Sequence, residues 1–282
     1  MAVELARIAV DLARRAGALV ADGRARAGGD RAGLGVRVKS TPTDVVTVMD
    51  RVCEDFLVDE LRRLRPQDAV VGEEGGTRAD GAAPAGPGQV RWLVDPIDGT
   101  VNYIYGVPQY AVSVAAERGG TVVAGAVHNP ASGETFWAWL DGGAYLSGGH
   151  GGEGQRLRVT SCSDLGQALV GTGFGYSAAV RAEQARAVAE LLPLVRDIRR
   201  LGSAALDLCF LAAGRLDAYY EARLYPWDYA AGALIAAEAG AWLAGLHGQP
   251  AGDDFVAAAA PGVAEAFFAL LESLHPVGGS GR

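Results

Sequence analysis

Helical spacing of apolar residues marks two segments near the beginning of the chain. Across residues 3–22, apolar side chains recur every three or four positions with charged residues between them, which predicts a surface helix with one buried face. The same spacing predicts a second helix over Val48–Leu64, which Pro66 ends. Residues 23–42 are rich in Gly and Arg and lack a hydrophobic period, so they are predicted to form a long loop.

Short segments of β-strand composition follow one another through the middle of the chain. Gly119-Gly120 lies between two of them as a hairpin signal, and successive strands joined by tight turns predict an antiparallel sheet. Residues 75–88 hold many Gly, Ala and Pro residues and are expected to form an exposed loop. The predicted strands are Val90–Val94, Tyr110–Glu117, Thr121–His128 and Glu134–Leu140.

Strands and helices alternate after about residue 150, which is typical of an α/β arrangement. The predicted fold class is therefore α/β, with an α+β lobe over residues 1–150 and an α/β lobe over residues 151–282 that completes the molecule. The strands expected in the second lobe are Leu157–Thr160, Ala168–Thr172, Asp197–Leu201 and Asp217–Glu221, and the helices are Ala178–Leu194, Ser203–Ala213 and Asp228–Ala239.

Composition and charge narrow the classes of function. The 282 residues are 50% hydrophobic and carry a formal net charge of -8, so the overall field of the protein does not attract nucleic acid or an anionic membrane, and direct nucleic-acid binding is not expected. No uninterrupted apolar run is long enough for a membrane span, and the N-terminus lacks a signal-peptide core, which predicts a cytoplasmic protein. The three cysteines show neither disulfide nor zinc-site spacing.

The segment from Asp95 to Thr100 carries the most informative chemistry. An apolar strand runs into a turn in which Pro96 fixes the backbone and Gly99 permits a tight bend, so Asp95 and Asp98 lie close together. Two adjacent carboxylates repel each other unless a cation lies between them. The pattern by itself indicates either an ordinary polar turn or a metal site, and the N–H groups of Gly99 and Thr100 are suited to hold a phosphate.

Three further acidic positions share this ambiguity. Glu73 follows the apolar run Ala69–Val71 and is either a solvated turn residue or a ligand at a strand end. Asp228 is placed to cap an apolar helix, and Asp50 lies in the first turn of the second helix, where the helix dipole stabilises it. Oxygen ligands without His or Cys favour magnesium over zinc.

These motifs together resemble the inositol monophosphatase family, and within it the bacterial inositol-1-monophosphatases. The resemblance covers most of the chain in the family's order, which makes it highly specific. The matching segments are Thr47–Asp50, Gly72–Glu74, Asp95–Thr100, Arg200–Asp207, Asp217–Glu221 and Trp227–Asp228.

The resemblance implies a layered αβαβα sandwich, a homodimer, two or three Mg²⁺ ions and inhibition by lithium. Carried over by position, it implies metal ligation by Glu73, Asp95, Asp98 and Asp228 and by the carbonyl of Ile97. It also implies catalytic roles for Glu73 and for Thr100 supported by Asp50, and phosphate contacts from Gly99 and Thr100. The implied contacts to the substrate's hydroxyl groups come from Asp98, Ala204, Glu221 and Asp228, and Lys39 matches a basic residue of a mobile loop.

The predicted activity is hydrolysis of a small polyol phosphate monoester, with inositol 1-phosphate as the leading substrate, by in-line attack of a metal-activated water. Relatives in the superfamily act on histidinol phosphate, fructose 1,6-bisphosphate or 3′-phosphoadenosine 5′-phosphate, and these remain alternatives. A binding role in transcription is a further alternative, because some bacterial relatives are implicated in contacts with the RNA-synthesis machinery.

Overall fold

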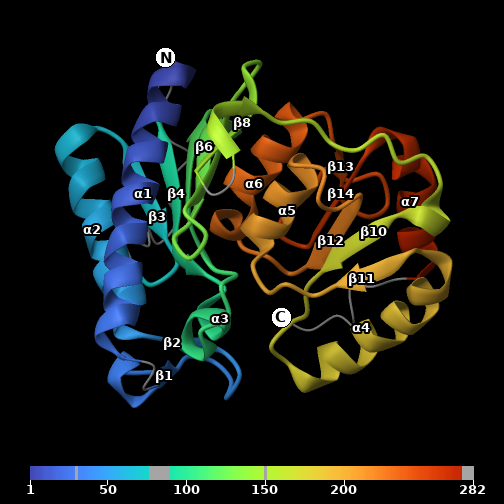
Figure 1. Cartoon of the computed structure of the whole chain (residues 1–282), viewed down its shortest axis with the longest axis horizontal. Helices are drawn as coiled ribbons and strands as arrows, with labels where there is room; N and C mark the ends of the chain where they lie inside the picture. Colours follow the sequence, from blue (N-terminus) through green and yellow to red (C-terminus); the bar gives the residue numbers. More distant parts are fainter. Residues whose placement is uncertain (29–30, 76–88, 149–150, 275–282) are drawn as a thin grey trace.

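Five layers stack across the molecule, as the computed structural model of residues 1–28, 31–75, 89–148 and 151–274 shows (Figure 1). Two helices, α1 (Ala2–Arg26) and α2 (Val48–Leu64), cover one face of a seven-stranded sheet. The middle layer consists of α5 (Ala204–Ala212) and α6 (Pro226–Glu238). A five-stranded sheet follows, and α4 (Ala178–Leu191) and α7 (Pro261–Leu274) form the outer layer. The predicted αβαβα sandwich is confirmed.

The first sheet has its strands in chain order. The strands are β3 (Ala69–Gly72), β4 (Arg91–Asp98), β5 (Ala111–Arg118), β6 (Thr121–Asn129), β7 (Glu134–Trp139), β8 (Gly143–Gly148) and β9 (Gly151–Arg156). The four strands predicted from Val90 to Leu140 correspond to β4–β7 and pair antiparallel, as expected. The pairs β7·β8 and β8·β9 are also antiparallel, and β3 adds a parallel pair at the edge of the sheet. Its last strand ends at Arg156.

The second sheet is mixed and has the order β11-β10-β12-β14-β13. The three strands β11, β10 and β12 are parallel, whereas β14 runs antiparallel to both of its neighbours. The strands are β10 (Leu169–Thr172), β11 (Asp197–Arg199), β12 (Ala218–Ala222), β13 (Trp242–Ala244) and β14 (Phe255–Ala259).

Apolar side chains fill every space between layers. One buried cluster lies between α1, α2 and the first sheet, and another lies between the second sheet and the outer helices. The largest cluster surrounds the α5–α6 layer and fills the spaces between it and both sheets. Strand β7 shows how one sheet serves two clusters, because Phe136 faces the middle layer while Trp137 faces α1. None of the helices in the described ranges is long and apolar enough to cross a membrane.

Two sequence-based expectations require correction. The segment 23–42 is not one long loop, because α1 continues to Arg26, residues 32–34 form a 3₁₀ turn, and β1 (Arg37–Val38) pairs with β2 (Val45–Val46). Residues 157–160 are not a strand. The N–H of Leu157 donates to Ala144 and that of Val159 to Ala239, on two different elements, so no ladder forms. The loop predicted over 75–88 falls, from residue 76, outside the described residues.

Candidate active site

A bulge at the end of β4 brings Asp95 and Asp98 to the same side of the sheet. Asp95 pairs with Ser113 and Asp98 with Ala111 on β5, so β4 holds one more residue than β5 between these pairs. Side chains alternate along a regular strand, and residues three apart would face opposite ways. The extra residue cancels that alternation. Pro96 fits here because a bulge does not require its missing N–H donor.

Gly99 allows the chain to turn directly from β4 into α3 (Thr100–Tyr105). Its φ of +94° lies in the left-handed region, and a Cβ at this position would approach the carbonyl oxygens of Gln109 and Gly202 to 2.9 and 3.0 Å. Glycine is therefore required both by conformation and by space. The turn places the N–H groups of Gly99 and Thr100 beside Asp98.

Asp98 links the end of β4 to the beginning of α5. Its Oδ2 accepts hydrogen bonds from Ser203 Oγ at 2.6 Å and from the N–H of Ala205 at 2.8 Å. Burial raises the pKa of Asp98 to about 6, although these hydrogen bonds oppose the rise. Ser203 was not predicted as a site residue, and its only sequence signal was its place as the N-cap of α5.

Asp50 and Thr100 form the hydrogen-bonded pair that the resemblance implies. Asp50 is the third residue of α2, and its Oδ2 accepts from the N–H of Thr47 at 2.8 Å and from its hydroxyl at 2.6 Å in a capping box. Thr100 Oγ1 lies 3.1 Å from Asp50 Oδ1 and 3.0 Å from the carbonyl oxygen of Ile97. Because a hydroxyl has one proton, the two oxygens compete for it. Burial raises the pKa of Asp50 to about 6.

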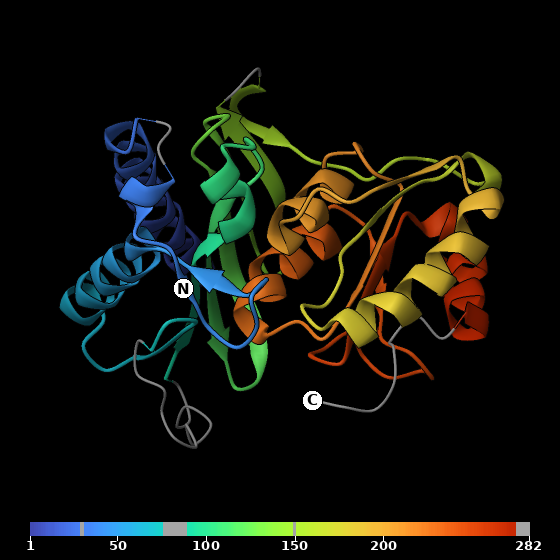
Figure 2. The same cartoon turned by 90° about the horizontal axis from the view of Figure 1, so that it is seen from below.

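Lys39 reaches the end of β3 from the β1–β2 hairpin. Its Nζ donates to Glu73 Oε1 at 2.9 Å and also to Glu74. Burial raises the pKa of Glu73 to about 7, and the charge of Lys39 opposes this rise. On the other side of the hairpin, the hydroxyl of Thr43 donates to the carbonyl of Tyr176 at 3.0 Å. The hairpin therefore contacts both halves of the chain, and Figure 2 shows its light-blue loop reaching toward the second half.

The second half of the chain contributes Asp228, Glu221 and Ala204. The N-cap of α6 is Tyr225 and not Asp228, because the helix begins two residues earlier than predicted. Asp228 is the third residue of α6, and its carboxylate reaches back to accept the N–H of Tyr225 at 2.7 Å. Glu221 on β12 accepts from the hydroxyl of Tyr219 at 2.7 Å. Ala204 is the buried first residue of α5.

Glu221 lies in a space that a side chain at Gly173 would fill, because a Cβ there would come within 2.0 Å of its carboxylate. Burial raises the pKa of Glu221 to about 7, against the donated hydrogen bond of Tyr219 and the positive charge of Arg200. Arg200 lies beyond β11, with its guanidinium 5.9 Å from the centre of the Phe174 ring.

Burial together with carboxylates from the two halves of the chain raises the pKa values of Asp95 and Asp228. Burial, followed by the charges of Glu73, Asp98 and Asp228, raises the pKa of Asp95 well above its usual range. Burial and the charges of Glu73 and Asp98 do the same for Asp228. Within the described ranges, no three acidic, His or Cys side chains stand in the geometry of a ready metal site, and Glu73 is paired with Lys39. The donor set, carboxylates and a carbonyl, suits a hard cation such as magnesium.

The five-layer fold and its buried acidic centre define the class of α/β proteins that includes metal-assisted phosphatases. A model described as the Inositol monophosphatase family matches residues 1–275. The chain belongs to the inositol monophosphatase family, and to the phosphatases.

Named relatives agree with this membership. The inositol-1-monophosphatase of Mycobacterium leprae is 51% identical over 278 residues, covering 96% of this chain and 94% of the relative. The Nus factor SuhB of Pasteurella multocida is 36% identical over 242 residues, covering 86% and 85%. The solved structure of Mycobacterium tuberculosis SuhB superposes with a TM-score of 0.80 at 44% identity, covering 98% of each chain.

Proposed function

We propose that the protein is a magnesium-dependent phosphatase that hydrolyses a small polyol phosphate monoester, with inositol 1-phosphate as the leading substrate. The observation that carries the proposal is the burial of four carboxylates, Glu73, Asp95, Asp98 and Asp228, with the charges of Glu73 and Asp98 acting on the other two. A bound cation would offset both the burial of these charges and their repulsion. The relative from Mycobacterium leprae, named an inositol-1-monophosphatase, supports the substrate.

The four carboxylates and the carbonyl of Ile97 would hold two or three Mg²⁺ ions. When bound, these ions supply the positive charge that offsets the phosphate and activates water. The hydroxyl of Thr100, held by Asp50, would position the attacking water and pass its proton toward the Asp50 carboxylate. Glu73 would hold the same water from the opposite edge of the site.

The substrate would lie between the two halves of the chain. The N–H groups of Gly99 and Thr100 would donate to the phosphate, as backbone donors at a tight turn do. The carboxylates of Asp98, Glu221 and Asp228, with Ala204 beside them, would accept from the hydroxyl groups of the sugar alcohol. This acceptor set favours a polyol over a nucleoside phosphate, while histidinol phosphate, fructose 1,6-bisphosphate and 3′-phosphoadenosine 5′-phosphate remain the alternatives. We also propose that the protein acts as a homodimer, as the family resemblance implies.

A parallel phosphate-release assay of these four substrates tests the proposal. Inositol 1-phosphate is expected to give the highest kcat/KM, excess chelator to abolish activity, added magnesium to restore it, and lithium to inhibit it. Full activity in excess chelator would contradict the proposed chemistry, whereas high activity on another of the four substrates would change only the substrate.

A second role in transcription is supported by the relative named Nus factor SuhB. Such a role would depend on surface contacts and not on the acidic centre. A catalytically inactive variant such as Asp95→Asn is therefore expected to retain it, and loss of both functions in that variant would count against a separate binding role.

A further inference from the structure

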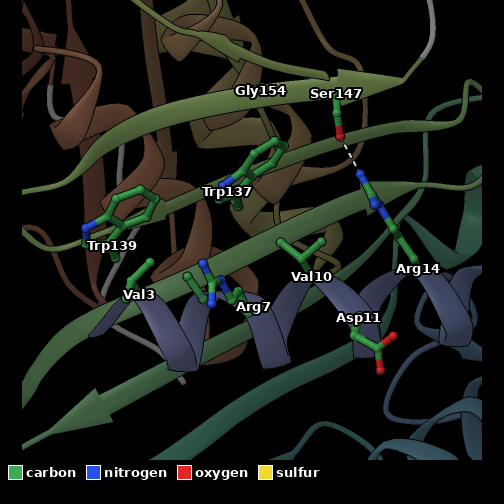
Figure 3. A pocket seen from close by; sticks show the side chains of 10 residues that line it. Val3, Arg7, Val10, Asp11, Arg14, Trp137, Trp139, Ser147 and Gly154 are labelled. Atoms are coloured by element: carbon green, nitrogen blue, oxygen red, sulfur yellow. Dashed lines mark hydrogen bonds between the residues drawn. The ribbon is translucent and has the colours of Figure 1, made fainter. Parts of the chain in front are cut away.

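A cavity of about 480 Å³ lies between the N-terminal half of α1 and the strands β7–β9 (Figure 3). Val3, Val10, Trp137 and Trp139 give it apolar walls, and Arg7 and Arg14 add positive charge. We propose that this cavity binds a small aromatic carboxylate, at a site separate from the acidic centre.

The cavity and the acidic centre lie toward opposite ends of α1. The hydroxyl of Tyr103 donates to the carbonyl of Val20 at 3.2 Å, and Arg24 donates to the carbonyl of Ile104 at 3.2 Å, so the C-terminal part of α1 contacts α3. The lining residues of α1 end at Arg14, six residues before Val20, which at the rise of an α-helix is a separation of ~9 Å. The described lining includes none of the residues proposed for phosphate hydrolysis, so a ligand in the cavity occupies a separate site.

The aromatic wall is held in place before any ligand arrives. Trp137 and Trp139 are two residues apart on β7 and lie on the face that α1 packs against. Tyr145 on β8 stacks with both indoles, at centroid distances of 5.8 Å from Trp137 and 5.3 Å from Trp139. Because this row of three rings fixes the indoles, a planar ligand would bind without reorganising them.

The charged groups of the cavity favour an anion. Arg14 is anchored to Thr135 at 3.0 Å and to Ser147, which leaves its Nη1 available among the described residues. Arg7 has neither a hydrogen-bond acceptor nor a carboxylate partner in the described part of the chain, and Figure 3 shows it beside the two indoles. Asp11 does not neutralise them, since it pairs with Arg15 at 3.1 Å.

Other classes of ligand fit less well. A metal ion would need several oxygen donors, and among the described lining residues the one carboxylate is Asp11, which is already paired. A polyol carries no charge for the two guanidiniums and brings hydroxyl groups to a wall that is largely apolar. A cavity of this volume is in the range of small-molecule sites. An aromatic carboxylate fits both parts of the wall. Its planar ring would pack against the indoles of Trp137 and Trp139, and its carboxylate would accept hydrogen bonds from the guanidiniums of Arg7 and Arg14.

NMR titration of the ¹⁵N-labelled full chain with 2-naphthoate tests the proposal. Trp137→Phe and Trp139→Phe assign the two indole N–H signals, and these are expected to shift with a dissociation constant on the order of 1 mM or tighter, given the ligand's size. Naphthalene-2-methanol, which lacks the charge, and cyclohexanecarboxylate, which lacks the aromatic ring, are expected to bind about tenfold more weakly.

Arg7→Gln is expected to weaken 2-naphthoate about tenfold and to leave naphthalene-2-methanol unchanged. Arg26→Gln, an exposed arginine in the last turn of the same helix, is the matched control and should change neither. The proposal is overturned if 2-naphthoate leaves both indole signals in place, if cyclohexanecarboxylate binds as tightly, or if the two arginine variants behave alike. Circular dichroism confirms that each variant is folded.

Discussion

Asp95 lies in an electrostatically unfavourable environment, because it is buried among other carboxylates. It is 2% exposed and has four other acidic groups acting on it, while its Oδ1 accepts the N–H of Ile97 at 2.9 Å. A residue in this environment is unfavourable for folding and is explained by binding to a cation.

Replacing Asp95 with Asn is therefore expected to have opposite effects on activity and on stability. Turnover with magnesium should fall by roughly three orders of magnitude or more, because an amide cannot supply the bridging charge. The melting temperature in chelator should rise, because a strained carboxylate is removed while the acceptor for Ile97 remains. Asp59→Asn, on the exposed face of α2, is the control. Near wild-type turnover at saturating magnesium would place the site elsewhere.

The raised pKa of Glu221 predicts how the stability of the metal-free protein depends on pH. Its pKa is raised from an ordinary 4.5 to about 7, so the folded state holds the proton more tightly than the unfolded state. This contribution is fully present below about pH 4.5 and is lost as the pH rises toward 7. The free energy of unfolding falls by ~3 kcal/mol at most from this cause.

Urea unfolding in chelator between pH 4.5 and 8 measures this effect. Glu221→Gln should match the wild type at low pH and be more stable at pH 8, because the amide keeps an acceptor for Tyr219 without the charge. Glu190→Gln, exposed on α4, should follow the wild-type curve. Parallel curves for the wild type and Glu221→Gln would contradict the assignment.

The β1–β2 hairpin is anchored unevenly. Only two residue pairs join its strands, and on β1 Val38 is 61% exposed, whereas on β2 Val46 is 4% exposed. The loop between the strands is attached by polar contacts at Lys39 and Thr43. Because β1 and this loop bury little apolar surface, they are expected to open more easily than β2.

Hydrogen exchange across residues 37–46 is expected to be fast in the metal-free protein and slower with magnesium and inositol 1-phosphate. Closure would carry Lys39 from Glu73 to the phosphate and exclude water. Amides of α1 give the internal reference. Equal protection in both conditions, or unchanged catalysis in Lys39→Ala, would show that the hairpin is a fixed connector.

Periodicity predicted the long elements better than the short ones. The helix expected over Val48–Leu64 is confirmed at those bounds, because its apolar face and Pro66 both mark it. The Gly-rich strands β8 and β9 and the Ala-rich β14 were missed, because their composition does not distinguish a strand from a loop. Helix α7 was missed although its apolar period carried the signal.

The acidic motifs were recognisable from sequence, whereas their arrangement was not. Asp95 and Asp98 stand out in the turn that holds them, yet the bulge that turns both to one side depends on register with β5. Likewise Ser203 meets Asp98 from 105 positions away, a pairing that no local pattern encodes.

At the scale of the whole molecule, the middle helices are shared by the two sheets. Helix α6 comes from the second half of the sequence but packs against β4 to β8 of the first sheet, and Ser113 on β5 donates to the carbonyl of Trp227 at 3.2 Å. The first sheet thus relies on later residues to cover one of its faces.

A fragment of residues 1–156 is consequently expected to aggregate or to bind a hydrophobic dye, because that face of the sheet would be exposed. Size-exclusion chromatography and dye fluorescence measure this, and mixing with residues 157–282 should reduce both effects. A monomeric fragment with the near-ultraviolet circular dichroism of a packed core would show that the first half folds alone.

The same interleaving orders events during synthesis on a ribosome. Asp95 and Asp98 leave the exit tunnel well before Asp228, whose helix closes both the acidic centre and the sheet above it. A nascent chain therefore cannot assemble the full ligand set until most of its length has emerged. If the proposed function holds, the nascent chain is expected to be inactive toward phosphate esters until the middle layer docks.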